Sequence, residues 1–122
     1  MKRVLIVEDD PALRESMAEI LADAGYTVSE AGDGRKGLEE ASERRPDLIL
    51  LDLMMPTMNG WQFRTAQRQL PALADIPVIV MSAWSSEQAD AGLEGVAARF
   101  PKPFDVSALL DGVRRYAGPA EC

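Results

Sequence analysis

The sequence has no histidine and a single cysteine, and both shortages restrict its chemistry. Without histidine, no imidazole can act as a general base, a nucleophile or a metal ligand. The one cysteine is the last residue, Cys122, so no disulfide can form within the chain. A reducing compartment is the natural expectation for such a chain. Any reaction chemistry must therefore come from carboxylates, hydroxyls or amines.

Basic residues are also scarce, because 13 Lys and Arg face 20 Asp and Glu, giving a net charge of −7. This charge argues against direct binding to nucleic-acid phosphates or to an anionic membrane surface. Long apolar runs are missing as well. The N-terminal run Val4–Val7 is too short for a signal peptide or a membrane span. We therefore expect a cytoplasmic protein.

The composition that remains is that of an ordinary globular domain. The chain has 122 residues, of which 47% are hydrophobic and 27% are charged. This length fits one compact domain, and no linker, repeat or low-complexity segment divides it. We expect a single domain over residues 1–117 and a short C-terminal tail over residues 118–122, with fraying from residue 117 onward.

Short apolar segments alternate with helical patterns along the chain. The most informative one is Leu48–Asp52, an unbroken Ile/Leu run that ends in an aspartate. Such a run is typical of a parallel strand buried on both faces. The other strands are expected at residues 4–7, 27–31, 76–81 and 99–101. Five βα repeats predict an α/β fold, with a parallel sheet covered by helices on both faces.

The expected helices carry signals at their ends. Asp10 suits the N-cap of the first helix, Pro11 its first position, and Gly25 its end. Asn59-Gly60 predicts a turn that tolerates positive φ. The remaining helices are expected at residues 35–45, 61–69 and 85–93 and after an Asp105 cap. Three residues of the second helix should face inward: Leu38, Ala41 and Ser42.

Groups suited to phosphoryl chemistry follow four of the five expected strands. They are Glu8 and Asp9 after the first strand, Asp52 at the end of the third, Ser82 after the fourth and Lys102 after the fifth. The carboxyl ends of parallel strands meet at one edge of the sheet, where ligands bind in such folds. Any one of these residues alone is more often a helix cap or a surface side chain. The set as a whole predicts a site.

The expected chemistry of this site follows from the residue types. Crowded carboxylates favour a hard divalent cation, and Mg²⁺ takes oxygen ligands in octahedral geometry. Asp9 and Asp52 are the expected ligands, with Glu8 acting directly or through water. A lysine and a hydroxyl suit phosphate oxygens. Together these groups can hold a phosphoryl group between a carboxylate nucleophile, a metal and a cation.

In this order and spacing, the motifs resemble the receiver domain of bacterial two-component response regulators, over about residues 2–117. The motifs are Glu8-Asp9, the segment from Asp52 to Gly60, Met81-Ser82-Ala83 and Lys102-Pro103-Phe104. The resemblance implies a flavodoxin-like, doubly wound sheet of five parallel strands in the order 2-1-3-4-5. The sequence departs from the family's usual pattern at Arg99, where an aromatic residue is common, and in a shortened, glycine-broken stretch between Ser82 and Lys102.

The resemblance also implies roles for the site residues. Asp52 would accept a phosphoryl group from a histidine kinase or phosphotransfer protein within a phosphorelay. Mg²⁺ would be held by Asp9, Asp52 and the backbone carbonyl of Met54, with Glu8 acting through water. The catalytic residues Ser82 and Lys102 would bind the phosphoryl oxygens, and Ser82 would relay the switch.

The expected output is protein binding. A downstream partner would dock on the face formed by the fourth helix, fifth strand and fifth helix, and the protein would be a monomer or a phosphorylation-dependent dimer. Since no output domain follows in this sequence, a stand-alone regulator is expected, unless the chain is a fragment of a longer protein. It would catalyse only its own phosphorylation and dephosphorylation, so we expect a signalling protein and not an enzyme.

Two other interpretations use the same residues. One is a small Mg²⁺-dependent phosphohydrolase with an aspartyl nucleophile, similar to the haloacid dehalogenase family. That family has a second aspartate two residues after the nucleophile, where this sequence has Met54. The other is a degenerate binding module that no longer takes phosphate, against which the intact set of site residues argues.

Overall fold

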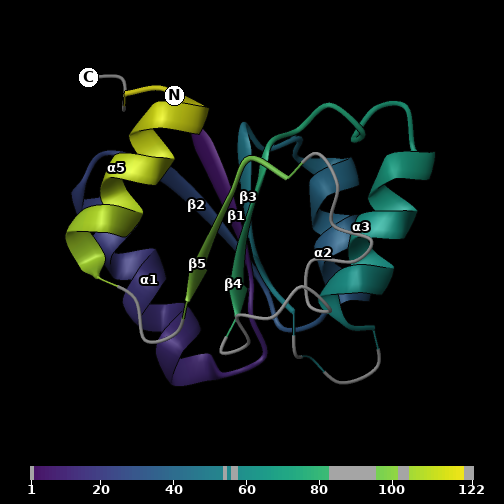
Figure 1. Ribbon diagram of the computed structural model, residues 1–122, viewed down its shortest axis with the longest axis horizontal. Coiled ribbons are helices and arrows are strands. Elements are labelled where there is room, and N and C mark those ends of the chain that lie inside the picture. The colour runs from purple at the N-terminus through teal and green to yellow at the C-terminus, as the bar shows by residue number, and fades with distance from the viewer. Residues whose placement is uncertain (1, 54, 56–57, 83–95, 102–104, 120–122) are drawn as a thin grey trace.

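The computed structural model describes residues 2–53, 55, 58–82, 96–101 and 105–119. Five parallel strands form one sheet in the order β2-β1-β3-β4-β5 (Figure 1). The strands are β1 (Arg3–Val7), β2 (Thr27–Ala31), β3 (Leu48–Asp52), β4 (Val78–Ser82) and β5 (Ala98–Pro101). The described helices are α1 (Pro11–Asp23), α2 (Gly34–Glu43), α3 (Gly60–Gln69) and α5 (Val106–Ala117). The predicted α/β fold and its strand order are confirmed.

Helices cover both faces of this sheet, with α1 and α5 on one side and α2 and α3 on the other (Figure 1). Alternate side chains of β1 point to opposite faces of the sheet. Leu5 and Val7 join the core beneath α2 and α3, and Val4 and Ile6 join the core beneath α1 and α5. Every residue of the central strand β3 is buried, as its unbroken apolar run predicts.

Helix α1 begins and ends where its sequence signals place it. The Asp10 side chain accepts hydrogen bonds from the backbone N–H groups of Ala12 and Leu13, and Pro11 occupies the first helical position. The helix ends at the cap residue Ala24, and Gly25 follows with φ 100°. Glycine adopts this left-handed conformation without a Cβ penalty. The first βα connection is therefore set largely by local sequence.

Helix α2 packs through smaller residues than the sequence pattern predicts. Ala41 is buried, but Ser42 is exposed, so the expectation that Ser42 faces inward was wrong. The buried stripe includes Gly37, where an added Cβ would lie 2.9 Å from Val7 Cγ2 and 3.0 Å from Phe63 Cε2. The buried residues of α2 are Gly34, Gly37 and Ala41, and Ser42 lies about 100° around the helix from Ala41, where it faces solvent.

The segment before α3 also differs from the prediction. Asn59 has φ −78° and caps the helix, which begins at Gly60, so a positive-φ turn here was wrong. The Asn59 side chain accepts from the Gln62 N–H at 2.9 Å, and the Gln62 side chain accepts from the Asn59 N–H at 2.9 Å. This reciprocal capping box satisfies two backbone donors and favours helix over turn.

Strand β4 starts at Val78, two residues later than predicted. Pro77 has no N–H to donate to a sheet ladder, although its carbonyl accepts from the Ile49 N–H at 3.0 Å. The helix predicted over residues 85–93 lies outside the described residues. In the described part of the chain, no helix has the length and apolar character needed to cross a membrane.

The chain is held in place beyond the point where fraying was predicted. Asp105 caps α5, accepting from the Ser107 N–H, and Ala117 ends the helix as a buried residue. The Tyr26 hydroxyl donates to the Gly118 carbonyl at 2.8 Å. Fraying from residue 117 was therefore wrong for these two residues, and residues 120–122 lie outside the described part.

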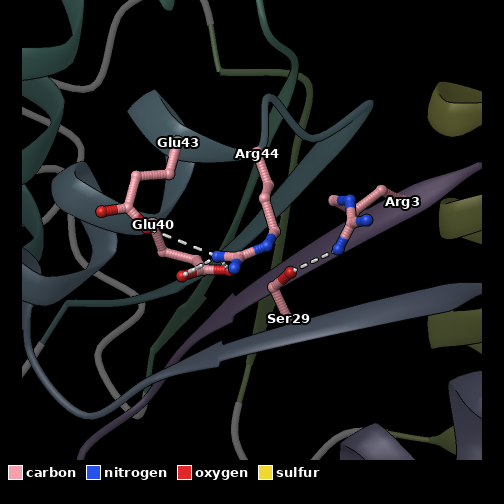
Figure 2. Close-up of polar contacts among 5 residues, drawn as sticks. All are labelled: Arg3, Ser29, Glu40, Glu43 and Arg44. Atoms are coloured by element: carbon pink, nitrogen blue, oxygen red, sulfur yellow. Dashed lines mark hydrogen bonds and ion pairs between the residues drawn. The ribbon is translucent and has the colours of Figure 1, made fainter.

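At the end of the sheet where the strands begin, charged groups meet complementary partners. The Arg3 N–H donates to Asp47 Oδ2 at 2.8 Å, and Arg3 Nη1 donates to Ser29 Oγ at 2.9 Å (Figure 2). Nearby in the same view, Arg44 forms ion pairs with Glu40 and Glu43 of α2 at 3.1 and 3.4 Å (Figure 2). Each of these charged groups therefore has a complementary partner.

Candidate functional site

Three acids lie at the opposite end of the sheet, where the strands finish. Glu8 and Asp9 directly follow β1, and Asp52 is the last residue of the neighbouring strand β3. One carboxylate oxygen from each of these three residues lies within 4.8 Å of the others. The structure brings together the three acids that the sequence places at this edge.

Two of these carboxylates are deeply buried. Glu8 is 0% exposed and Asp52 is 3% exposed, whereas Asp9 is exposed to solvent. Like charges this close repel, and burial strengthens the repulsion because little water screens it. Carboxylate oxygens without nitrogen or sulfur donors are the ligand set of a hard cation such as Mg²⁺. The residues present therefore fit a divalent cation, reached from the solvent side of Asp9.

Backbone and side-chain contacts fix the turn that carries Glu8. The Glu8 N–H donates to the Ala31 carbonyl at 3.0 Å, which extends the β1–β2 ladder past the end of β1. The Glu8 carbonyl accepts from Arg14 Nη1 at 2.9 Å. Arg14 was not among the predicted site residues. One signal in the sequence could have indicated it: Arg14 is a basic residue in the first turn of the helix that follows Glu8 and Asp9.

The Asp52 side of the site depends on a close helix approach. The Gly60 N–H donates to the Leu53 carbonyl at 2.9 Å. A Cβ at Gly60 would lie 2.7 Å from Leu53 Cα and 2.8 Å from the Asp52 carbonyl oxygen. Both are backbone atoms that cannot simply move aside, so glycine allows α3 to start directly against Asp52. The sequence predicts a turn residue at Gly60 and does not indicate this contact.

Of the other predicted site residues, the structure describes only the backbone of Ser82. Ser82 ends β4, and the register pairs Asp52 with Met81, so the Ser82 backbone is at the same edge as Asp52. The Ser82 side chain, Lys102 and Met54 lie outside the described part of the chain. Their predicted roles stay predictions.

A parallel α/β sheet with acids gathered at its carboxyl edge defines a class of proteins that bind and react at that edge. The chain also matches the model of the response regulator receiver domain over residues 4–114. It therefore belongs to the response regulator receiver domain family, as its resemblance predicts. Membership in this family favours a signalling protein over the haloacid dehalogenase interpretation.

Curated relatives agree with this assignment. The chain is 40% identical over 119 residues to the DNA-binding dual master transcriptional regulator RpaA of Synechocystis sp., covering 93% of this chain and 48% of that protein. It is 40% identical over 115 residues to the response regulator MprA of Mycolicibacterium vanbaalenii, covering 92% and 48%. The chain thus spans about half the length of the curated relatives it matches.

Solved structures show the same fold over nearly all of their length. The chemotaxis protein CheY4 of Vibrio cholerae has a TM-score of 0.89 at 32% identity, covering 95% of this chain and 98% of that one. The receiver domain of the sensor histidine kinase PA1611 from Pseudomonas aeruginosa has a TM-score of 0.86 at 25% identity, covering 96% and 98%. The latter structure has a magnesium ion coordinated in its active site cleft.

Proposed function

We propose that this chain is a phosphoacceptor, in which Asp52 receives a phosphoryl group from a histidine kinase or phosphotransfer protein. One observation carries the proposal: buried Asp52 ends the central strand, with its carboxylate within 4.8 Å of those of Glu8 and Asp9. Membership in the receiver family and the magnesium ion described for the PA1611 receiver domain support it.

In the proposed reaction, an Asp52 carboxylate oxygen attacks the phosphorus atom of a phosphohistidine. The new P–O bond forms as the P–N bond breaks, and the bonding electron pair leaves with the imidazole nitrogen. This chain contains no histidine, so the donor lies outside it. The product is an acyl phosphate on Asp52, and hydrolysis of that bond by water resets the domain.

The remaining site residues receive the roles that the family resemblance gives them. Mg²⁺, when bound, would offset the negative charge of the incoming phosphoryl oxygens. Asp9, Asp52 and the Met54 carbonyl would hold the cation, with Glu8 acting through water. The Ser82 hydroxyl and the Lys102 ammonium would bind phosphoryl oxygens.

The proposed output is a change in protein binding, with no separate substrate turned over. The docking face would consist of the fourth helix predicted over residues 85–93, β5 and α5, and phosphorylation would alter either a partner's affinity or a monomer–dimer equilibrium. Arg99 of β5 stands at the position where the family commonly has an aromatic residue. We further propose a cytoplasmic domain over residues 1–117 that makes no direct contact with nucleic acid, consistent with its net charge of −7.

The proposal is tested by phosphorylation with a small donor. The protein is incubated with acetyl phosphate and Mg²⁺, and the site of phosphorylation is located by mass spectrometry. We expect a single phosphoryl group on Asp52, none on Asp52→Asn, and full labelling of the control Asp47→Asn, which changes an acid at the other end of the sheet. Equal labelling of Asp52→Asn and the parent would refute the assignment.

A further inference from the structure

Both the N–H and the carbonyl of Glu8 are hydrogen-bonded, and the carbonyl accepts from a side chain of α1. The Glu8 N–H donates to the Ala31 carbonyl at 3.0 Å, and the Glu8 carbonyl accepts from Arg14 Nη1 at 2.9 Å. The same guanidinium contacts Glu30 Oε1 through Nε at 3.4 Å. Arg14 therefore joins the end of β1 to the end of β2, at the residue that starts the acidic cluster.

The surroundings of Arg14 favour a fixed position. Its side chain is 21% exposed, that of Glu30 is 41% exposed, and Glu8 is fully buried. A Cβ at Gly32 would lie 3.4 Å from Arg14 Nη1, an ordinary van der Waals contact, so the guanidinium lies directly beside the β2–α2 turn. The planar fork of arginine can reach two separate acceptors at once, which a lysine ammonium does only poorly.

We infer that Arg14 is a positioning residue for the divalent-cation site: it fixes the Glu8 peptide and so sets the directions of the Glu8 and Asp9 carboxylates. This inference rests on the proposed function, because cation binding is part of it. A cation site needs its ligands placed within a narrow range of geometry, and Mg²⁺ tolerates little deviation from octahedral.

A purely electrostatic role of Arg14 predicts the opposite result for some variants. A positive charge near the site repels Mg²⁺, so by charge alone Arg14→Gln should bind Mg²⁺ more tightly and Arg14→Lys should bind it like the parent. A positioning role predicts weaker binding in both, because each loses the two-point contact to Glu8 and Glu30. The lysine variant separates the two explanations.

The experiment measures Mg²⁺ affinity by calorimetric titration of the parent, Arg14→Lys and Arg14→Gln. Lys36→Gln is the matched control, because Lys36 lines the same surface cavity of about 650 Å³ as Arg14 and Glu30 but is a separate positive charge on α2. We expect both Arg14 variants to raise the Mg²⁺ Kd about fivefold, the effect of losing one hydrogen bond. Lys36→Gln should bind at least as tightly as the parent.

A second readout follows the Glu8 peptide itself. In the metal-free proteins, exchange of the Glu8 amide hydrogen should be faster in Arg14→Lys than in the parent or in Lys36→Gln, since the turn is held from one side only. Parent-like Mg²⁺ affinity in Arg14→Lys, or tighter binding in Arg14→Gln, would overturn the positioning role while leaving Asp52 phosphorylation intact. Absence of Mg²⁺ binding in the parent would instead contradict the proposed function.

Discussion

The two ends of the same sheet handle charge in opposite ways. Where the strands begin, the Arg3 N–H donates to Asp47 at 2.8 Å and its guanidinium donates to Ser29 at 2.9 Å, so a charge and a complementary partner meet. Where β1 and β3 finish, Glu8, Asp9 and Asp52 bring three like charges within 4.8 Å. The first arrangement stabilises the fold. The second gathers like charges, for which the proposed cation site gives a reason.

The largest expected contrast comes from the same substitution at each end. In metal-free buffer, Asp52→Asn should raise the free energy of unfolding by about 1–2 kcal/mol, because it removes one buried like charge. Asp47→Asn should lower it by about 0.5–1 kcal/mol, because a charged acceptor for the Arg3 N–H becomes a neutral one. Urea unfolding of the two variants and the parent measures both effects.

The sign of the change decides whether the comparison holds. If metal-free Asp52→Asn loses as much stability as Asp47→Asn, a carboxylate charge has the same effect on the free energy of unfolding at both ends of the sheet, and the comparison fails. The substitutions are isosteric, so neither opens a cavity, and the difference between them reports on charge and hydrogen bonding.

A smaller effect concerns Tyr26, which precedes β2 at the end where the strands begin. Its hydroxyl donates to the Gly118 carbonyl at 2.8 Å. Burial raises the pKa of Tyr26 above the ordinary value of 10.0, and the Arg114 charge lowers it by a smaller amount. The unfolded chain therefore releases this proton at a lower pH than the folded protein does.

It follows that the contribution of Tyr26 is fully present below pH 10.0 and is lost as pH rises through its folded pKa. Tyr26→Phe should lose about 1 kcal/mol at neutral pH, the value of one hydrogen bond, and should show a shallower decline above pH 10. Unfolding measured across the alkaline range provides the test. Parallel declines in the two proteins would show that Tyr26 does not carry this dependence.

Most of the fold follows from local sequence, and particular elements show why. The bounds of β2 and β3 match the prediction residue for residue. β3 is a short unbroken apolar run that ends at an aspartate, and β2 is a short segment with glycines close to both of its ends. The Asp10 cap of α1 is likewise a matter of adjacent residues. The meeting of Glu8, Asp9 and Asp52 followed from one further rule, that parallel strands finish at the same edge.

Other features depended on distances between segments and could not be predicted in this way. Gly60 and Arg14 gain their importance from atoms of Asp52, Glu8 and Glu30, which the sequence alone does not place against them. Ser42 was misplaced because the buried stripe of α2 is centred on two glycines, Gly34 and Gly37, which an apolar pattern does not mark.

A buried polar network on α3 gives the same lesson. The Gln67 side chain donates to the carbonyls of Leu73 and Ile76 at 2.9 and 3.1 Å and accepts from Arg64 Nη1 at 2.9 Å. Gln67 is 0% exposed, although its polar side chain is of a type found mostly at the surface. Burial, and to a lesser degree the charge of Arg68, lowers the pKa of Arg64. The two carbonyls that accept from Gln67 belong to the connection after α3, and the helical period of α3 does not predict their position.

The central claim is that the acids at the carboxyl end are gathered to hold a divalent cation beside Asp52. Thermal unfolding of the parent and of Asp52→Asn, each with and without Mg²⁺, tests it most directly. A ligand that binds only the folded state adds about 2.7 kcal/mol at 100 times its Kd. We predict that saturating Mg²⁺ raises the Tm of the parent and barely changes that of Asp52→Asn, so that the metal-free advantage of the variant shrinks or reverses. An equal shift in both proteins, or no shift in the parent, would contradict the claim.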